Sequence, residues 1–329
     1  MAQVFWPALS CVLAFAMGAL TDSVALGAQV KQVPVEYESV GGHGLGLGNT
    51  GAASLVGPSS VRVNPALLAL EKQYQLYGGY NWPGAGREFY QVGVVDSKTS
   101  SIAAGVMYTG YMDDYKYRDE LKSAEEGLDS PIVRRGVVGI AKTLSKVSVG
   151  LGGHYIEGEG LATDRETGQA LGRTNGIGLS GGIAALLTPA IRVGASAENV
   201  SNKKIADYAP TTYRGGLAYI MAEGNVVAGV DYRQRDRVEY FEASRPDPLN
   251  PDASDDDLMD SPERMGFVSL TARIQNFLRF LGSYGQSLSD ERRSLSGGMA
   301  VVQDKFSLSY SISKPHLKHE PLHQSVNLA

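Results

Sequence analysis

The sequence lacks several features that common functional classes need. It has 329 residues but a single cysteine, Cys11, and a formal net charge of −5. One cysteine cannot close an intrachain disulfide, so no disulfide framework supports the fold. A mildly acidic chain without a basic footprint argues against nucleic acid as a partner, because phosphate backbones are bound by clustered Lys and Arg.

Long apolar runs are also missing, except at the N-terminus. Elsewhere no run approaches the roughly 18 apolar residues of a spanning helix. Residues 5–20 are apolar and are followed by small residues at 25–28. We therefore predict a signal peptide over 1–28, although the usual basic residues before it are absent. An uncleaved membrane anchor is the alternative, and a lipoprotein at Cys11 fits less well because the apolar run continues past it.

Motifs for catalysis and metal binding are equally scarce. The five histidines are scattered without the spacing of metal ligands. The acidic run 252–257 lacks the spacing and the glycine of a calcium loop, which favours a solvated charge run. No serine or cysteine nucleophile motif is present. We predict no catalytic residue, no metal and no cofactor, and hence a protein that is not an enzyme.

The chain is rich in glycine and tyrosine, with 40 and 17 residues, and in segments that alternate between apolar and polar side chains. Residues 305–313 are typical, because Phe306, Leu308, Tyr310 and Ile312 alternate with serines. Side chains alternate across a strand, so such a segment has one apolar and one polar face. Each segment is near the roughly 9–11 residues of a membrane-crossing strand. We predict about fourteen strands, starting near Gln73, Arg87, Ser101, Arg134, Lys146, Thr174, Ala190, Thr212, Asn225, Glu263, Asn276, Glu291, Lys305 and Pro321.

The connections between these segments alternate between short and long. Short ones lie at 96–100, 143–145, 188–189, 223–224 and 303–304, and long ones at 112–133, 158–173, 201–211 and 237–262. Bacterial outer-membrane barrels have this asymmetry, and a closed barrel leaves no strand edge exposed to lipid. We predict an all-β fold: a transmembrane antiparallel β-barrel of about 14 strands in outer-membrane lipid. A soluble β-sandwich or propeller is the alternative, but it gives no reason for the alternating connections.

Residues 44–51, Gly-Leu-Gly-Leu-Gly-Asn-Thr-Gly, contain the glycine spacing of a dinucleotide-binding site. Such a site needs an apolar strand before the glycines, a helix after them and an acidic residue about 20 positions later. Residues 37–43 are not an apolar strand, and Gly57-Pro58 interrupts the following segment. The spacing therefore does not indicate nucleotide binding.

Residues 44–70 fit another pattern better. A glycine-rich segment, Asn64-Pro65-Ala66 and a strand from Gln73 follow one another. This order resembles the N-terminal segment of the FadL superfamily of outer-membrane proteins, especially its PorV/PorQ-like and UPF0164-like branches. The resemblance implies a fourteen-stranded barrel with an N-terminal plug in its lumen. It assigns 29–72 to the plug and 73–329 to the barrel.

The same resemblance suggests two functions. FadL members carry hydrophobic substrates such as long-chain fatty acids across the outer membrane, whereas PorV-like members are linked to type IX secretion. Passive transport of a hydrophobic small molecule is the leading hypothesis. The alternative is a structural partner of a secretion or surface protein, for which the long connections would be the docking surface.

The plug segment supplies the first set of candidate site residues. Glycines let its backbone approach the barrel wall closely, and Pro65 suits the first position of a short helix over 65–70. Asn64 can bond nearby backbone groups, and helix capping alone would also explain it. The candidates for ligand binding or gating are Gly46, Gly48, Asn49, Gly51, Asn64, Pro65 and Ala66.

Polar residues on the predicted inner face of the wall form the second set. They could line a polar conduit or anchor the plug, or they could simply be paired charges that fill a narrow barrel. The set consists of His154, Arg192, Glu198, Arg214, Asp231, Arg233, Arg273 and Arg279.

Overall fold

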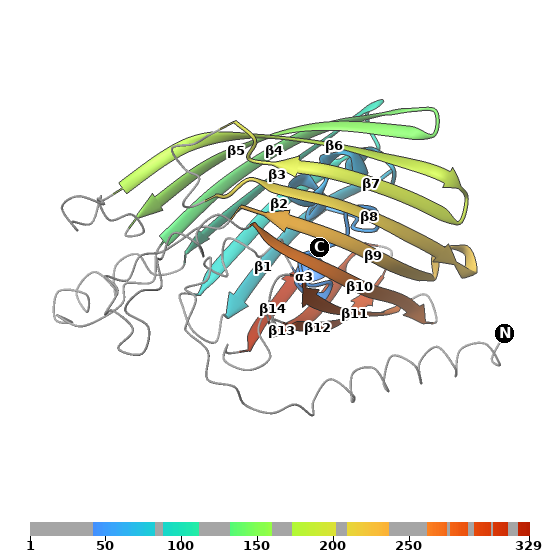
Figure 1. Ribbon diagram of the computed structural model, residues 1–329. Helices are drawn as coiled ribbons and strands as arrows, with labels where there is room; N and C mark the ends of the chain where they lie inside the picture. Colours follow the sequence, from blue (N-terminus) through green and yellow to red (C-terminus); the bar gives the residue numbers. More distant parts are fainter. Residues whose placement is uncertain are drawn as a thin grey trace. The chain divides into compact units, whose positions relative to one another are not determined.

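A computed structural model describes residues 42–82, 88–111, 132–159, 173–201, 209–236, 262–274, 277–288, 293–303, 305–314 and 322–329 (Figure 1). The predicted signal peptide and the acidic run 252–257 lie outside these residues. The predicted boundary between plug and barrel at residue 72 stays a prediction.

Fourteen antiparallel strands form a closed barrel in which each strand pairs with its neighbours in sequence and β1 pairs with β14. The predicted fold class is confirmed, and every strand begins within two residues of its predicted start. The strands are β1 (Tyr74–Trp82), β2 (Phe89–Asp96), β3 (Ile102–Tyr111), β4 (Ile132–Leu144), β5 (Val147–Glu159), β6 (Arg173–Thr188), β7 (Ile191–Glu198), β8 (Thr212–Met221), β9 (Val226–Arg235), β10 (Glu263–Ile274), β11 (Leu278–Ser287), β12 (Arg293–Val302), β13 (Ser307–Lys314) and β14 (His323–Leu328).

The two ends of the barrel differ in their connections. Residues 145–146 and 189–190 join strands at one end, whereas 112–131 and 236–262 join strands at the other. We call these the short-turn end and the long-loop end. The alternation read from the sequence is therefore the alternation between the two ends of one barrel.

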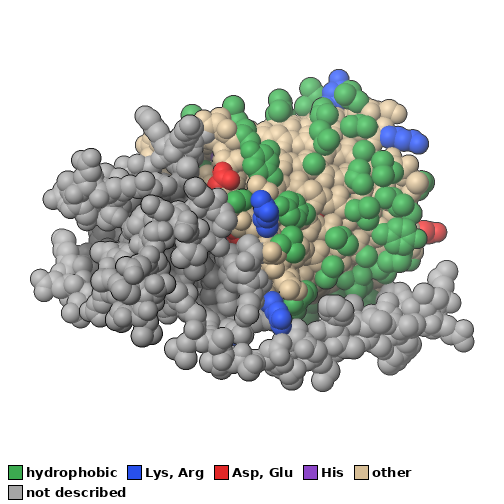
Figure 2. Space-filling model, in the orientation of Figure 1, with side chains coloured by type: hydrophobic (Ala, Val, Ile, Leu, Met, Phe, Trp, Pro, Cys, Tyr) green, Lys and Arg blue, Asp and Glu red, His purple; other side chains and the backbone are tan. Residues whose placement is uncertain are grey.

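The outer face of the barrel is apolar. In β13, Leu308 and Tyr310 are 49 % and 40 % exposed, whereas Ser311, the next residue along the strand, is fully buried. Hydrophobic side chains cover much of the described outer surface in Figure 2. A soluble sandwich would bury this face, so the alternation belongs to a barrel whose outside contacts lipid.

Aromatic side chains on the outer face gather towards the ends of the strands. At the long-loop end, Tyr80 meets Trp82 edge-on with ring centroids 4.7 Å apart. Rings that are apolar with one polar tip favour the membrane interface, so the aromatic rows mark its two sides. The long-loop row holds Tyr80, Tyr90, Tyr108, Tyr155, Tyr213, Tyr232 and Tyr284, and the short-turn row holds Tyr74, Tyr219, Phe280 and Phe306.

Residues 42–70, here called the inner segment, lie inside the barrel. They form the helix α3 (Gly42–Gly46), the helix α4 (Ser60–Val63) and the 3-10 helix η2 (Pro65–Ala69). None of the described helices is long and apolar enough to cross a membrane. Helix α3 packs against β11 to β14 and η2 against β3 to β6, which are strands on different sides of the ring. The inner segment therefore reaches across the lumen.

Apolar side chains hold the inner segment to the wall. Leu47, Leu55 and Leu67 pack with Ala184 of β6 and Leu281 of β11. A second cluster joins Val61, Leu68 and Ala69 to Val95, Ala103, Val137 and Ala141 of the wall. The inner face of the wall thus carries two apolar patches against which the inner segment packs.

Candidate functional site

The glycine motif of the inner segment ends a helix. The Gly48 amide donates to the Leu45 carbonyl at 3.0 Å, and the Asn49 amide donates to the Gly44 carbonyl at 2.7 Å. Gly48 has a positive φ of 66°. These two bonds around a left-handed residue are a Schellman motif, in which glycine is strongly preferred.

The other glycines of this motif allow close approach. A Cβ at Gly46 would lie 3.2 Å from Leu281 of β11, and one at Gly51, where φ is 106°, would lie 2.9 Å from Leu55. No described strand precedes the motif, and its first glycines lie in α3, so the motif ends a helix instead of starting one. A dinucleotide site has the opposite order, so the structure gives the physical reason why the spacing does not indicate one.

Asn64 connects three parts of the protein. Its Oδ1 accepts a hydrogen bond from the Ala66 amide at 3.1 Å, which caps η2. Its Nδ2 donates to the Ala52 carbonyl at 2.7 Å and to the Ile183 carbonyl of β6 at 3.1 Å. Pro65 is the first residue of η2, so the predicted short helix forms, as a 3-10 helix. The side chain therefore both caps the helix and ties the inner segment to the wall.

Hydroxyl groups of the wall bond the carbonyls of the inner segment. Short helices leave such carbonyls without partners inside the helix. The bonds run from Ser196 Oγ to Val63 O at 2.6 Å, from Ser148 Oγ to Ala66 O at 2.6 Å and from Thr143 Oγ1 to Ala69 O at 3.1 Å. The wall thus supplies hydrogen-bond donors to carbonyls of α4 and η2.

Glycines of the wall make room for this backbone. The register pairs Gly150 with Gly182 and Gly194 with Gly216, all on the inner face. A Cβ at Gly150 would lie 2.5 Å from the Pro65 carbonyl carbon, and one at Gly194 would lie 2.8 Å from the Ala52 carbonyl carbon. We call these four residues the glycine row. Its lack of side chains is what lets the inner segment dock.

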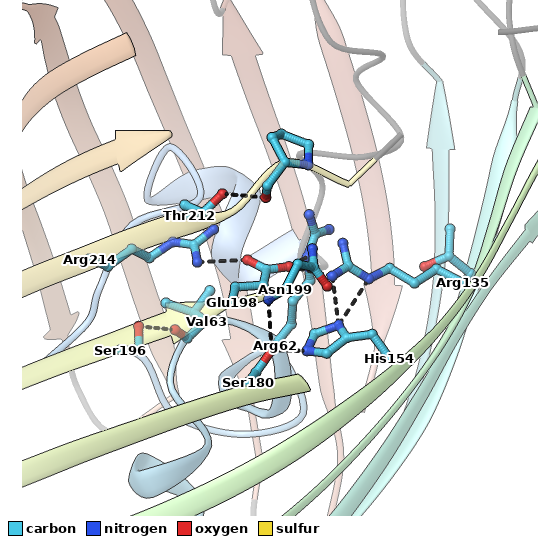
Figure 3. A network of polar contacts seen from close by, with 12 residues as sticks. Arg62, Val63, Arg135, His154, Ser180, Ser196, Glu198, Asn199, Thr212 and Arg214 are labelled. Carbon is cyan, nitrogen blue, oxygen red and sulfur yellow. Dashed lines mark hydrogen bonds and ion pairs between the residues drawn. The ribbon is translucent and has the colours of Figure 1, made fainter. Parts of the chain in front are cut away.

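A buried group of charges lies beside α4 (Figure 3). Glu198, the last residue of β7, accepts from Arg62 Nε of α4 at 3.1 Å and from Arg214 Nη1 of β8 at 2.7 Å. Arg135 of β4 bonds the same carboxylate. Each of these four side chains is less than 10 % exposed. We call them the Glu198 hub, which joins the inner segment to three strands.

The hub continues into β5 and β6. Arg135 Nε donates to His154 Nδ1 at 3.2 Å, and Ser180 Oγ bonds His154 Nε2. Because arginine can only donate, Nδ1 accepts and the ring hydrogen is on Nε2. The Asn199 amide donates to Ser180 Oγ at 3.4 Å, which closes the chain of contacts beside Glu198. The hub and these further contacts therefore link five neighbouring strands, β4 to β8.

The other predicted wall residues also face inwards, and one of them, Arg233, is directly opposite Arg214 of the hub in the strand register. Asp231 Oδ1 accepts from the Ala52 amide at 2.8 Å, and Arg192 Nη1 donates to the Ala53 carbonyl at 3.5 Å. Both residues therefore contact the inner segment.

Three further arginines lie on β9, β10 and β11. The Arg233 guanidinium lies 5.2 Å from the centre of the Phe267 ring, and its Nη2 is 3.8 Å from Glu263 Oε2. Arg273 and Arg279 are directly opposite each other on neighbouring strands near the short-turn end.

Sequence reasoning brought Glu198, His154 and Arg214 into one set but missed Arg62 and Arg135. Arg135 lies at a position that the alternation of its strand assigns to the inner face, so it could have been predicted. Nothing around Arg62 in the sequence indicates a buried ion pair. Among the described residues, no group of three or more His, Cys, Asp or Glu could hold a metal ion.

Replacing Asn64 with alanine is expected to lower the free energy of unfolding by about 2–4 kcal/mol, because a cap is lost and the buried Ala52 carbonyl and the partly buried Ile183 carbonyl lose a donor. Urea titration of the refolded protein in detergent measures this. The control is Asn81→Ala, since Asn81 is also buried but makes one long bond, of 3.5 Å, to Phe89 O. Equal losses in the two variants would contradict the role assigned to Asn64.

Solved structures share this fold at low sequence identity. The crystal structure of the Pseudomonas putida toluene transporter TodX matches with a TM-score of 0.59 and 15% identity, over 89% of this chain and 96% of that chain. A Pseudomonas aeruginosa FadL homologue matches with a TM-score of 0.52 and 10% identity, over 92% and 98%. No protein-family model and no curated protein matches the sequence. The PorV-like branch therefore has no support beyond the sequence resemblance.

Proposed function

We propose that this protein is a channel of the bacterial outer membrane that lets a hydrophobic small molecule cross passively, and that the inner segment controls passage. The observation that carries the proposal is a lumen spanned by a segment that is docked on the wall but is not one of its strands. The apolar outer face with its two aromatic rows supports a place in a membrane, and the similar fold of a toluene transporter supports transport.

The inner segment suits a gate because its contacts are many and individually modest. It is held by side-chain packing, by hydrogen bonds worth about 1 kcal/mol each and by the Glu198 hub. The barrel strands pair only with one another. The segment can therefore move while the hydrogen bonds that close the barrel stay intact.

The substrate we propose is a compact hydrocarbon. TodX is named as a toluene transporter, and its variants as a monoaromatic hydrocarbon channel. In this chain, displacing the inner segment would uncover Val95, Ala103 and Val137 on the inner wall. An apolar surface that is exposed only when the gate moves would favour an apolar solute over ions.

A reversible crosslink tests transport and gating together. A Cβ at position 139 of β4 would lie 3.3 Å from Val61 Cγ1, which makes Val61→Cys with Gly139→Cys a candidate disulfide. The assay is initial uptake of radiolabelled toluene by intact cells with a lipopolysaccharide outer leaflet. We expect the wild type to raise uptake above empty vector, the oxidised variant to abolish the increase and a reductant to restore it.

The single variant Val61→Cys controls for the oxidant and the reductant. Equal uptake by wild type and empty vector would overturn hydrocarbon transport. Raised uptake that the crosslink leaves unchanged would overturn the gating role while leaving transport standing.

A further inference from the structure

Three side-chain oxygens converge beside Gly229 of β9. A Cβ added at Gly229 would lie 2.6 Å from Ser269 Oγ and 3.6 Å from both Asp231 Oδ2 and Ser54 Oγ. Ser269 is directly opposite Gly229 on β10, Asp231 follows on the same face of β9, and Ser54 belongs to the inner segment. Oxygens from the inner segment and from two strands of the wall therefore surround one point that no side chain fills.

Asp231 is a buried carboxylate without a direct ion pair. It is 5 % exposed, and in the described part of the chain it forms no ion pair within 4 Å. Glu198 and Glu263, the other buried carboxylates of the described wall, each contact an arginine. The amides of Gly51 and Ala52 donate to Asp231, but a carboxylate has about four acceptor positions. Its charge is therefore held by dipoles and is open to a cation.

Ser54 contributes a second group that calls for a partner. Its hydroxyl oxygen is buried and has no hydrogen-bond partner among the described residues. Buried polar groups normally bond to protein, to water or to an ion. Ser269 is partly exposed on the inner face, so a small solute of the lumen can reach these oxygens.

We propose that the side-chain oxygens of Ser54, Asp231 and Ser269 bind a sodium ion, which fastens the inner segment to β9 and β10. Carboxylate and neutral oxygens are the ligands of hard cations, and water completes their coordination. Such a site needs only one carboxylate, so it contains no cluster of His, Cys, Asp and Glu. The inference rests on the docking of the inner segment and does not depend on the hydrocarbon proposal.

The charges around the site favour a monovalent ion. The charge of Arg214 also acts on Asp231, although the guanidinium itself is bonded to Glu198. Sodium would neutralise Asp231 and leave no excess charge on the pair. Calcium would leave one further positive charge near Arg214, and it normally takes several charged oxygen ligands.

Binding of radioactive sodium to the purified full chain in nonionic detergent tests the site, with choline chloride holding the ionic strength constant. We expect saturable binding of about one ion per chain, which Asp231→Asn weakens at least about 10-fold. Ser54→Ala should weaken it about 5–10-fold, since one neutral ligand is lost. The control is Ser59→Ala, because Ser59 is also a buried serine of the inner segment. It should change binding by less than about twofold.

Gly229→Ala keeps all three oxygens and fills the point between them. The new Cβ meets the Ser269 hydroxyl, which can rotate aside, so the barrel should fold while sodium binding is lost. A second readout is the rate at which trypsin cleaves after Arg62 of the inner segment. Sodium should slow this cleavage in the wild type but not in Gly229→Ala, because a ligand of the docked state stabilises that state.

Three results would overturn the proposal. They are the absence of saturable sodium binding, equal binding by the wild type, Ser54→Ala and Gly229→Ala, and displacement of the sodium by calcium at lower concentrations than by sodium chloride. Binding that leaves cleavage after Arg62 unchanged would overturn the fastening role. The heat-dependent mobility of the barrel on SDS gels shows whether each variant is folded, and toluene uptake is measured separately, so the hydrocarbon proposal can fail independently.

Discussion

Replacing Glu198 with glutamine is expected to loosen the inner segment while the barrel remains closed. Arg62, Arg135 and Arg214 would lose their shared negative charge and stay buried. Removing one partner of a buried ion pair typically costs about 3–5 kcal/mol, because the remaining charge is left uncompensated. We expect a loss of this size in the free energy of unfolding, measured by urea titration in detergent micelles.

Trypsin gives an independent readout of the same change. Arg62 is 2 % exposed and is therefore protected from cleavage in the wild type. In Glu198→Gln the Arg62 side chain is released from its partner, so cleavage after Arg62 should become rapid under native conditions. Mass spectrometry of the fragments identifies the site. A protected Arg62 in a folded Glu198→Gln variant would show that the hub does not hold the inner segment.

The matched control is Glu157→Gln. Glu157 also pairs with an arginine, Arg134, at 2.7 Å, but this pair is partly exposed near the long-loop end. Such pairs contribute about 0–1 kcal/mol because water competes for both charges. We expect normal protection of Arg62 in this variant and a small change in unfolding free energy. A loss as large as that of Glu198→Gln would mean that any missing carboxylate destabilises the barrel.

Introducing valine at Gly150 is expected to detach η2 from the wall. The new side chain would occupy the place of the Pro65 and Ala66 backbone, which cannot move aside as a flexible side chain would. Overpacking typically costs about 1–3 kcal/mol, and the upper end applies where backbone is the obstacle. We expect rapid cleavage after Arg62 and a higher ion conductance in planar bilayers, since the lumen is no longer spanned.

Gly153→Val on the same strand is the control. Gly153 faces outwards, and a Cβ there would lie 3.6 Å from Val138 Cγ2, an ordinary van der Waals distance. Valine also suits a strand that faces lipid, so this variant should match the wild type in conductance and in protection of Arg62. If Gly150→Val and Gly153→Val behaved alike, the glycine row would not be the surface on which the inner segment docks.

The two substitutions disturb different parts of the same docking surface. Glu198→Gln removes an attraction at the long-loop end, whereas Gly150→Val adds a repulsion near the middle of the wall. Both substitutions should reduce the protection of Arg62 from trypsin. Only the glycine substitution places a new side chain at the position where η2 docks. Conductance should therefore separate them, with the larger increase in the variant whose inner segment is displaced at η2.

The sequence by itself determined the strands, the alternation of faces and the two kinds of connection. These features are local: the side-chain period of a strand and the length of a turn can be read within about ten residues. Pro65 after Asn64 likewise predicted a short helix start, and the glycines predicted close approach. The same local signals indicated that Glu198, Arg214 and His154 face the lumen, because each has a fixed parity within its strand.

Only the tertiary structure decided which of these residues meet. Arg62 bonds Glu198 across 136 residues of sequence, and Ser148 bonds Ala66 across 82. Such contacts depend on the register of every strand pair, on the pairing of β1 with β14 and on where the inner segment rests. No local pattern encodes these contacts. The sequence therefore shows that the wall is rich in glycine, but it does not show that four of these glycines form the surface on which the inner segment docks. The strands could be predicted from the periodicity of their side chains, whereas the docking of the inner segment depends on the closed barrel that surrounds it.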